Sequence, residues 1–175
     1  MPGVAGKTVA VVGRAASLVG SGNGPAIESC DVVVRVNWML PVKGPKRDVG
    51  RRTDLLYYCG GCLGQRGAAK RLRVRRCEVD RKLRRKLSRN PAEIRPTTGV
   101  VAIFDALRSG CREVRAFGFD FYSTGYASPA PAWRGAAPLS WRHDPEEDRQ
   151  ALRHLLESEP RFKPDATLAV ALGAA

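Results

Sequence analysis

Short apolar runs separated by polar segments set the hydrophobic pattern of the chain. Such runs lie at residues 9–12, 31–36, 54–58 and 114–117. Continuous apolar runs of this length are typical of strands that are buried on both faces of a parallel sheet. A similar run predicts a final strand at residues 168–172.

Helical patterns lie between and after these runs. Residues 25–29 predict a short helical turn, and Thr97 or Thr98 is placed to cap a longer helix that Gly110 ends. A second capped helix is predicted at residues 144–157, where acidic residues fill the first turn, as the helix dipole favours. This alternation of strands and helices predicts an α/β sandwich with a mostly parallel sheet.

The remaining segments read as loops. Prolines, glycines and charged residues predict loops at 38–52, 60–67 and 123–142. The sequence has no internal repeat and no change of composition that marks a second domain. Its 175 residues suit one domain with an ordinary core, so we expect a single domain over residues 1–175.

Residues 66–90 form a strongly basic segment. Val79, Leu83 and Leu87 recur every four positions among arginines and lysines, which predicts an amphipathic helix with a basic outer face. Such a face is either simply solvated or a docking surface for a polyanionic acceptor or nucleic acid.

The charge balance is lopsided, with 30 Lys and Arg against 17 Asp and Glu, a net charge of +13. A surface of this kind attracts polyanions and speeds the arrival of small anions. A general bias of the genome towards arginine explains the same numbers without any dedicated partner.

The five cysteines indicate a reducing compartment. Their odd number, without a signal peptide, predicts free thiols in a cytoplasmic protein. Cys59 and Cys62 have the spacing of a zinc half-site or a redox pair. Cys77 and Cys111 lack the short spacing of a second half-site, so loop thiols are the simplest interpretation. No stretch approaches the roughly 18 apolar residues of a membrane span.

A glycine-rich loop, with Gly13, Gly20, Gly22 and Gly24, follows the first apolar run. It is not the dinucleotide fingerprint, because the glycine cluster begins well after the strand, and it is not a P-loop, because no Gly-Lys-Ser/Thr follows. The glycines indicate only a close approach of the backbone, either to a ligand or within tight turns.

Three segments, in order, resemble the eukaryotic-type sialyltransferase family, which transfers sialic acid from CMP-sialic acid. Residues 9–37, VAVVGRAASLVGSGNGPAIESCDVVVRVN, with 44–55, GPKRDVGRRTDL, resemble its L motif. Residues 95–120, RPTTGVVAIFDALRSGCREVRAFGFD, resemble its S motif. His143, in RHDPEED, stands where the short VS motif has a histidine followed by an acidic residue. The matches cover a little under half of the chain.

The resemblance implies a Rossmann-like three-layer sandwich, a variant of the GT-A-like fold, that binds the CMP part of a CMP-sugar donor. Asn37 would hydrogen-bond the nucleotide, and Gly118 would let the backbone approach the cytidine. The helix N-terminus at Thr97 would offer hydroxyl and N–H groups. The binding residues that it implies are Gly13, Arg14, Ser17, Asn37, Thr97, Thr98, Gly99 and Gly118.

The resemblance also implies a catalytic role for His143, as the general base that removes the proton of the acceptor hydroxyl. The family works without a metal, and no D-x-D pair follows a strand here, so no cofactor is expected. A further family motif carries a His-Tyr pair that assists the departing phosphate. This chain has no histidine there, and Tyr126, or its neighbour Tyr122, is placed to substitute as a donor.

Other positions of this chain also differ from the family pattern. The family usually has Gly-Asn after the first strand, where this chain has Gly13 and Arg14, and an arginine there is placed to pair with the donor phosphate or carboxylate. The family's disulfide is absent, because Cys111 has Val9 at the partner position. These features suggest a short prokaryotic or viral relative.

The sequence therefore predicts a metal-independent, inverting glycosyltransferase that uses a CMP-sugar donor and a hydroxyl acceptor, such as a glycan. Two alternatives stay open. One is a hydrolase or N-glycosidase that uses water in place of the acceptor. The other is a basic, nucleic-acid-associated nucleotide-binding module that uses residues 66–90.

Overall fold

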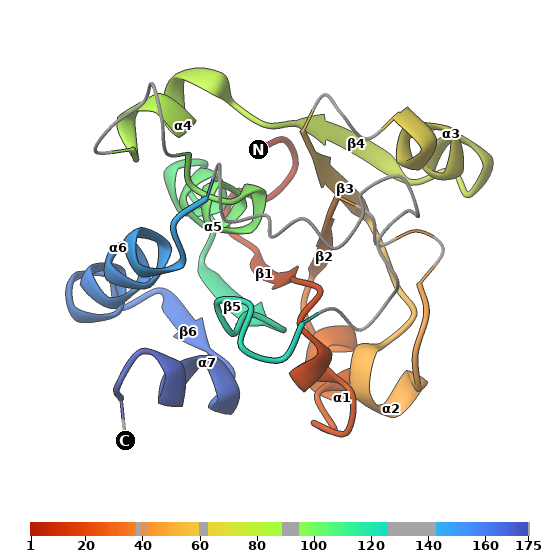
Figure 1. The fold of residues 1–175 in the computed structure, drawn as a ribbon. Coiled ribbons are helices and arrows are strands. Elements are labelled where there is room, and N and C mark those ends of the chain that lie inside the picture. Colours follow the sequence, from red (N-terminus) through yellow and green to blue (C-terminus); the bar gives the residue numbers. More distant parts are fainter. Residues whose placement is uncertain (38–39, 41, 60–62, 89–94, 126–142, 175) are drawn as a thin grey trace.

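A single sheet of six parallel strands forms the centre of the computed structural model (Figure 1), in the order β4-β3-β2-β1-β5-β6. The structure describes residues 1–175 except 38–39, 41, 60–62, 89–94, 126–142 and 175. The strands are β1 (Thr8–Val12), β2 (Val32–Val36), β3 (Leu55–Tyr58), β4 (Arg75–Glu78), β5 (Glu113–Phe117) and β6 (Phe162–Pro164).

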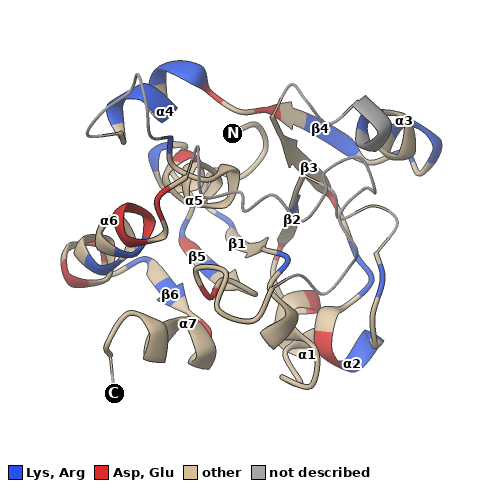
Figure 2. Cartoon of the chain, in the orientation of Figure 1, with Lys and Arg blue, Asp and Glu red and all other residues tan. Residues whose placement is uncertain are grey.

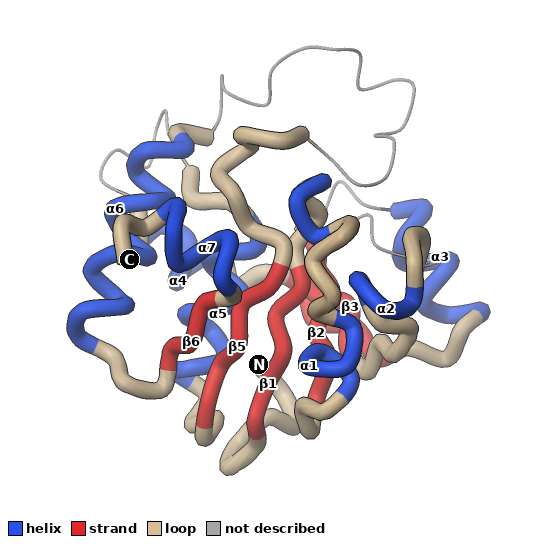
Figure 3. Tube along the Cα trace, turned by 90° about the horizontal axis from the view of Figure 1, so that it is seen from below, coloured by secondary structure: helices blue, strands red, loops and turns tan. Residues whose placement is uncertain are grey.

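Helices cover both faces of this sheet (Figure 3). A short 3₁₀ turn, η1 (Ala16–Leu18), precedes them. The helices are α1 (Gly24–Glu28), α2 (Lys46–Val49), α3 (Leu63–Arg71), α4 (Arg81–Lys86), α5 (Thr98–Arg108), α6 (Pro145–Ser158) and α7 (Ala166–Ala171). One apolar cluster joins the sheet to α5 and α6, and two others join its opposite face to α1, α2 and α3. The predicted three-layer α/β architecture with a parallel sheet is confirmed.

The four central strands and both capped helices lie where the sequence predicts them. β1, β2, β3 and β5 overlap the four apolar runs, because strands buried on both faces need apolar side chains at successive positions. The predicted turn at 25–29 is α1, and the loop predicted at 38–52 contains the short helix α2.

The predicted strand at 168–172 is wrong, because this segment is the helix α7. Asp165 caps it: its carboxylate accepts a hydrogen bond from the Leu168 N–H at 2.8 Å. The last strand of the sheet along the chain, β6, comes before this helix and was not predicted.

The amphipathic helix predicted from Val79, Leu83 and Leu87 is confirmed only as the short helix α4, in which Leu83 is buried, and the residues before it have another structure. The chain leaves α3 at Arg71, forms strand β4 and enters α4 only at Arg81. Two hydrogen bonds close α3, from Val74 N–H to Ala69 C=O at 2.8 Å and from Arg73 N–H to Lys70 C=O at 3.2 Å. This is the Schellman pattern, and it turns the chain away from the helix axis. Arg73 occupies the left-handed position of that turn, with φ of 54°.

The strand order reverses beside β1. Successive strands β1 to β4 extend the sheet in one direction, whereas β5 crosses back and pairs with the other side of β1. In open α/β sheets, ligands bind at the carboxyl ends of the strands at such a switch point. Gly13 follows β1 and Gly118 follows β5, so both glycines lie at this point.

The cluster Gly20, Gly22 and Gly24 serves the packing of the protein itself. The Gly22 N–H donates to the Asp48 carboxylate at 3.0 Å, and Gly20 donates to it as well. These hydrogen bonds hold the pKa of Asp48 below its usual range. A Cβ on Gly24 would lie 2.2 Å from the Lys46 carbonyl oxygen, so α1 and α2 pack together only with glycine there. The anion held by this loop is a carboxylate of α2.

Arg35 is a fully buried cation within β2, at 0% exposure. Its guanidinium donates to the Val49 carbonyl at 2.7 Å, to the Arg52 carbonyl at 3.1 Å and to the Thr53 hydroxyl at 3.0 Å. Burial lowers the pKa of Arg35 to about 10. The side chain therefore ties the loop before β3 to the middle of the sheet.

We expect Arg35→Met to lower the free energy of unfolding by about 2–4 kcal/mol, because it leaves these acceptors without a donor in a buried site. Urea denaturation measures the change. Arg47→Met, at an exposed position of α2, is the control and should change stability little. An Arg35→Met variant as stable as the parent would show that the buried charge is dispensable.

Within the described segments, no helix combines the length and the apolar character that a membrane crossing requires.

Candidate active site

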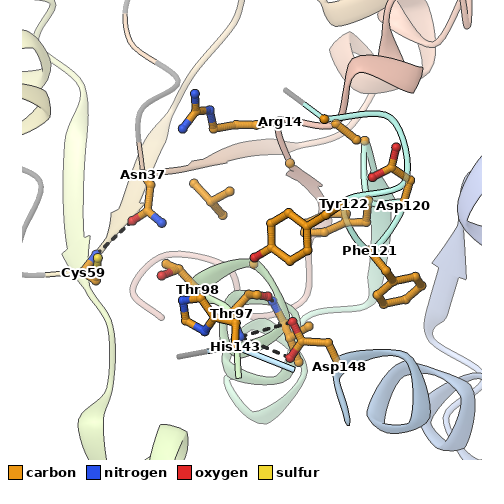
Figure 4. Close-up of a pocket in the computed structure, with 18 of the residues that line it drawn as sticks. Arg14, Asn37, Cys59, Thr97, Thr98, Asp120, Phe121, Tyr122, His143 and Asp148 are labelled. Atoms are coloured by element: carbon orange, nitrogen blue, oxygen red, sulfur yellow. Dashed lines mark hydrogen bonds between the residues drawn. The ribbon is translucent and has the colours of Figure 1, made fainter. Parts of the chain in front are cut away.

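A pocket of about 150 Å³ opens at the switch point of the sheet (Figure 4). Its walls come from the ends of β1, β2 and β5, the start of α5 and the segment that leads into α6. Of the residues predicted from the sequence, those that line it are Gly13, Arg14, Asn37, Thr97, Thr98, Gly99, Gly118 and His143. Residues that lie far apart along the chain are thus brought into one cavity by the strand order.

Asn37 is held in place directly after β2. Its backbone has a left-handed φ of 50°, which asparagine tolerates better than most residues. The side-chain oxygen accepts a hydrogen bond from the Cys59 N–H at 3.1 Å. The amide nitrogen therefore lies on the side of the carboxamide away from Cys59, where it can reach a ligand in the pocket.

Gly13 and Gly118 form the floor between β1 and β5. A Cβ on Gly13 would lie 2.3 Å from the Gly118 carbonyl oxygen, so no side chain fits there. Gly118 has a left-handed φ of 69°, and its N–H donates to the buried Asp165 carboxylate at 3.1 Å. Both glycines are thus required by the contact between the two strand ends as well as by any ligand above them.

The N-terminus of α5 points into the pocket. The Thr97 hydroxyl caps it by accepting from the Val100 N–H at 3.4 Å. The N–H groups of a first helical turn have no carbonyl partners within the helix, and the dipole makes this end positive. Only glycine fits at position 99, because a Cβ there would lie 2.2 Å from the Phe119 ring. This end of α5 suits the oxygens of a phosphate.

His143 stands beside this helix end, half-buried. Its Nδ1 lies 2.5 Å from the Arg95 carbonyl oxygen. Because a carbonyl only accepts, Nδ1 carries the proton in this contact. In the neutral tautomer that has this proton, Nε2 is the basic nitrogen.

Asp148 is a buried carboxylate at the wall of the same pocket, 3% exposed. Both of its oxygens accept from the Thr97 N–H, at 3.2 and 3.3 Å. Burial outweighs these hydrogen bonds and raises the pKa of Asp148 to about 6. From the sequence, Asp148 is recognisable only as one of the acidic residues in the first turn of α6. Its nearness to His143 along the chain was the one signal available.

Tyr122 projects into the cavity from the loop after β5 (Figure 4). This residue and Phe121 both have left-handed backbones, with φ of 68° and 53°. Such conformations are strained for aromatic residues. The Phe121 ring is held under the Arg149 guanidinium, 5.1 Å from the ring centroid. Tyr126, the other tyrosine predicted from the sequence, lies outside the described residues.

Ser17 is the one predicted binding residue within the described chain that does not line the pocket. Its hydroxyl donates to the Asp120 carboxylate at 3.1 Å, and its N–H donates to the Thr124 hydroxyl at 2.9 Å. Asp120, which does line the pocket, also accepts from the Thr124 N–H at 3.2 Å. Ser17 therefore holds the loop that carries Tyr122 in place, without lining the pocket itself.

Of the described cysteines, Cys30, Cys77 and Cys111 are free thiols. Burial raises the pKa of Cys30, Cys77 and Cys111, which makes these thiols poor nucleophiles. Cys59 lines the pocket, whereas Cys62 lies outside the described residues. No group of three or more potential metal ligands occurs in the part of the chain that the structure describes.

A pocket of this kind, with glycines at two strand ends and a helix N-terminus, is typical of nucleotide-binding α/β proteins. Comparison with known families shows which of these proteins the chain resembles. Residues 4–74 match the family described as Glycosyltransferase family 29 (sialyltransferase). The resemblance predicted from the sequence is thus confirmed for this part of the chain, which is similar to the sialyltransferases.

Solved structures agree on the fold. A mammalian sialyltransferase in complex with Gal-beta-1-3GalNAc-ortho-nitrophenol aligns with a TM-score of 0.62 and 20% identity, over 91% of this chain and 69% of its own. The sialyltransferase CstII from Campylobacter jejuni, in complex with the substrate analogue CMP-3FNeuAc, aligns with a TM-score of 0.64 and 16% identity, over 95% and 85%. No curated protein sequence matches the chain significantly.

Proposed function

We propose that the protein is a glycosyltransferase that moves a sugar from a CMP-activated donor to a hydroxyl group of an acceptor. One observation carries the proposal. The pocket at the switch point brings the α5 N-terminus, which suits a phosphate, together with His143, whose Nδ1 is held by the Arg95 carbonyl. The family match supports this reading, as do sialyltransferase structures solved with CMP and with acceptor saccharides.

In this proposal, the donor binds along the carboxyl ends of β1, β2 and β5. The Asn37 amide donates to the nucleotide, while the phosphate faces Thr98 and Gly99 at the start of α5. Arg14, in the same wall, adds a positive charge towards the phosphate or the carboxylate of the sugar.

The reaction follows from this placement. His143 Nε2 takes the proton of the acceptor hydroxyl, and the acceptor oxygen forms a bond to the anomeric carbon of the sugar. The bond between that carbon and the phosphate oxygen breaks, and its electron pair leaves with CMP. Attack from the face opposite the leaving group inverts the anomeric centre. Hydrogen-bond donors at the α5 N-terminus stabilise the released phosphate, and the Tyr122 hydroxyl is placed to assist.

We further propose that transfer requires no divalent cation, because the charge of the departing phosphate is met by the helix end and by Arg14. The rate should therefore be the same with EDTA as with added magnesium.

We expect CMP to bind in preference to AMP, GMP and UMP, with Asn37→Gly weakening CMP binding about tenfold or more through loss of a hydrogen bond. Glycine is chosen because it accepts the left-handed backbone at this position. Calorimetric titration measures both effects. Ser158→Ala is the control, because Ser158 is exposed at the end of α6 and does not line the pocket. Equal binding of the four nucleotides would contradict the proposal.

Transfer and hydrolysis are separated by the products. Incubation of CMP-sialic acid with the protein, with and without a panel of saccharide acceptors, should release CMP rapidly only when an acceptor is present. Release at the same rate in both cases would instead identify a hydrolase.

A further inference from the structure

A second hollow, of about 620 Å³, lies along the edge strand β4 and the end of α3. We call it the basic hollow, because five cations line it: Arg66, Lys70, Arg73, Arg75 and Arg76. All five side chains are exposed. Lys and Arg gather along α3, β4 and α4, whereas several Asp and Glu lie on α6 (Figure 2). The hollow is therefore a concave site with one sign of charge.

These five cations are not neutralised within the described chain, where no ion pair joins any of them to a carboxylate. Elsewhere on the surface, arginines do find partners, such as Arg108 with Asp80 at 2.6 Å and Arg112 with Asp31 at 3.2 Å. The acidic residue nearest in sequence, Glu78, pairs with Arg81 at 3.7 Å. Mutual repulsion thus remains in the hollow until an anion enters.

Arg73 carries a backbone cost as well. It holds the left-handed position that closes α3, where glycine is favoured and a long side chain is strained. Its side chain makes no hydrogen bond or ion pair with the described residues that would offset this strain. Strain that local packing does not repay points to a functional role for the side chain.

The basic hollow and the active-site pocket are both lined by residues at the end of β3. Tyr58, the last residue of β3, lines the hollow, and the next residue, Cys59, lines the pocket. The lining residues of the two cavities therefore meet at the carboxyl end of β3, and the hollow extends from there to Leu55 and Arg75, at the opposite ends of β3 and β4.

Resting on the proposed function, we infer that the basic hollow binds the acidic part of a glycan acceptor and so selects acceptors that carry repeated negative charges. A glycan fits better than a nucleic acid, because single strands bind through aromatic platforms. The one aromatic side chain in the hollow, Tyr58, is 7% exposed and has the Arg66 guanidinium 5.8 Å from its ring centroid.

Protection of the sheet edge is a simpler role for part of this charge. Cations on an edge strand prevent it from pairing with another sheet, and this accounts for Arg75 and Arg76. It does not account for Arg66 and Lys70 on α3, or for the strained Arg73.

The test compares two triple variants that remove the same net charge. One is Arg66→Gln, Arg73→Gly and Arg76→Gln within the hollow. The other is Lys7→Gln, Arg47→Gln and Lys163→Gln, at exposed positions outside it. The probes are oligogalacturonate, a neutral malto-oligosaccharide of the same length and oligothymidylate of the same length. Binding is measured by fluorescence anisotropy over a series of salt concentrations, and CMP binding is measured in parallel.

We expect oligogalacturonate to bind the parent protein with a steep dependence on salt, and the neutral sugar not to bind. The hollow variant should lose about tenfold or more in affinity, about 1.4 kcal/mol or more by the standard conversion. The outside variant should stay within about twofold. CMP binding should be the same in all three proteins. The single change Arg73→Gly should raise the melting temperature, which shows that lost binding is not lost folding.

Equal losses in the two triple variants would overturn the inference, because they would show a diffuse effect of net charge. Oligothymidylate binding tighter than oligogalacturonate would overturn it in favour of a nucleic-acid surface. The two proposals fail separately: absent CMP binding in the parent protein contradicts the proposed function, whereas absent oligogalacturonate binding contradicts the basic hollow.

Discussion

His143→Gln is expected to lower the rate of sugar transfer by about two to four orders of magnitude, the range that general-base catalysis contributes. Glutamine can still donate to the Arg95 carbonyl that holds the ring in place, but it cannot take a proton at neutral pH. The loss corresponds to about 3–5 kcal/mol in the activation free energy. Initial rates of CMP release from CMP-sialic acid, with a saccharide acceptor, measure it.

CMP affinity should be unchanged in this variant, because the base acts on the acceptor and not on the nucleotide. The control is His154→Gln, at an exposed position of α6, and its rate should equal that of the parent protein. A His143→Gln variant that keeps most of its activity would exclude His143 as the base and would direct attention to Asp148 on the same wall.

Asp148→Asn is expected to stabilise the protein at pH 8, by about 1–3 kcal/mol, while leaving its stability unchanged near pH 4. The reason is the raised pKa of Asp148, about 6 in the folded protein because of burial. Between about pH 4 and pH 6, the folded state holds this proton more tightly than the unfolded state. The parent protein therefore loses stability as the pH rises through that interval, and the asparagine variant does not.

Urea denaturation at several values of pH measures the difference between the two proteins. The control is Glu157→Gln, at an exposed position of the same helix, which should change stability little at any of these pH values. If Asp148→Asn proves less stable than the parent at pH 8, the charge of Asp148 is compensated in the fold, with Arg84 the nearest candidate.

The sequence reveals best those elements that are buried on both faces. β1, β2, β3 and β5 need apolar side chains at every position, and their runs are visible without any structure. β4 is an edge strand whose side chains face solvent, so its arginines carry no strand pattern. It forms because its backbone pairs with β3. The apolar segment at 168–172 is too short for its composition to separate strand from helix, and the cap at Asp165 decides.

The candidate site was predictable where it follows strand ends and helix caps. Asn37, Gly118 and Thr97 lie at such positions, and the family resemblance points to the same residues. Asp148 could not be weighted from the sequence. Its burial and its contact with Thr97 arise only when α6 packs near the start of α5, which brings together residues 51 positions apart.

The Asp48 carboxylate, which the glycine-rich loop binds, competes with other anions for that loop. Asp48 occupies the N–H groups of Gly20 and Gly22 from within the same chain. An intramolecular ligand acts at an effective concentration that is typically millimolar or higher. A free phosphate ion at lower concentration would gain little by displacing it. The glycine-rich loop, which most resembles a phosphate-binding loop, is therefore closed to phosphate. A nucleotide that enters this protein instead meets hydrogen-bond donors at the N-terminus of α5.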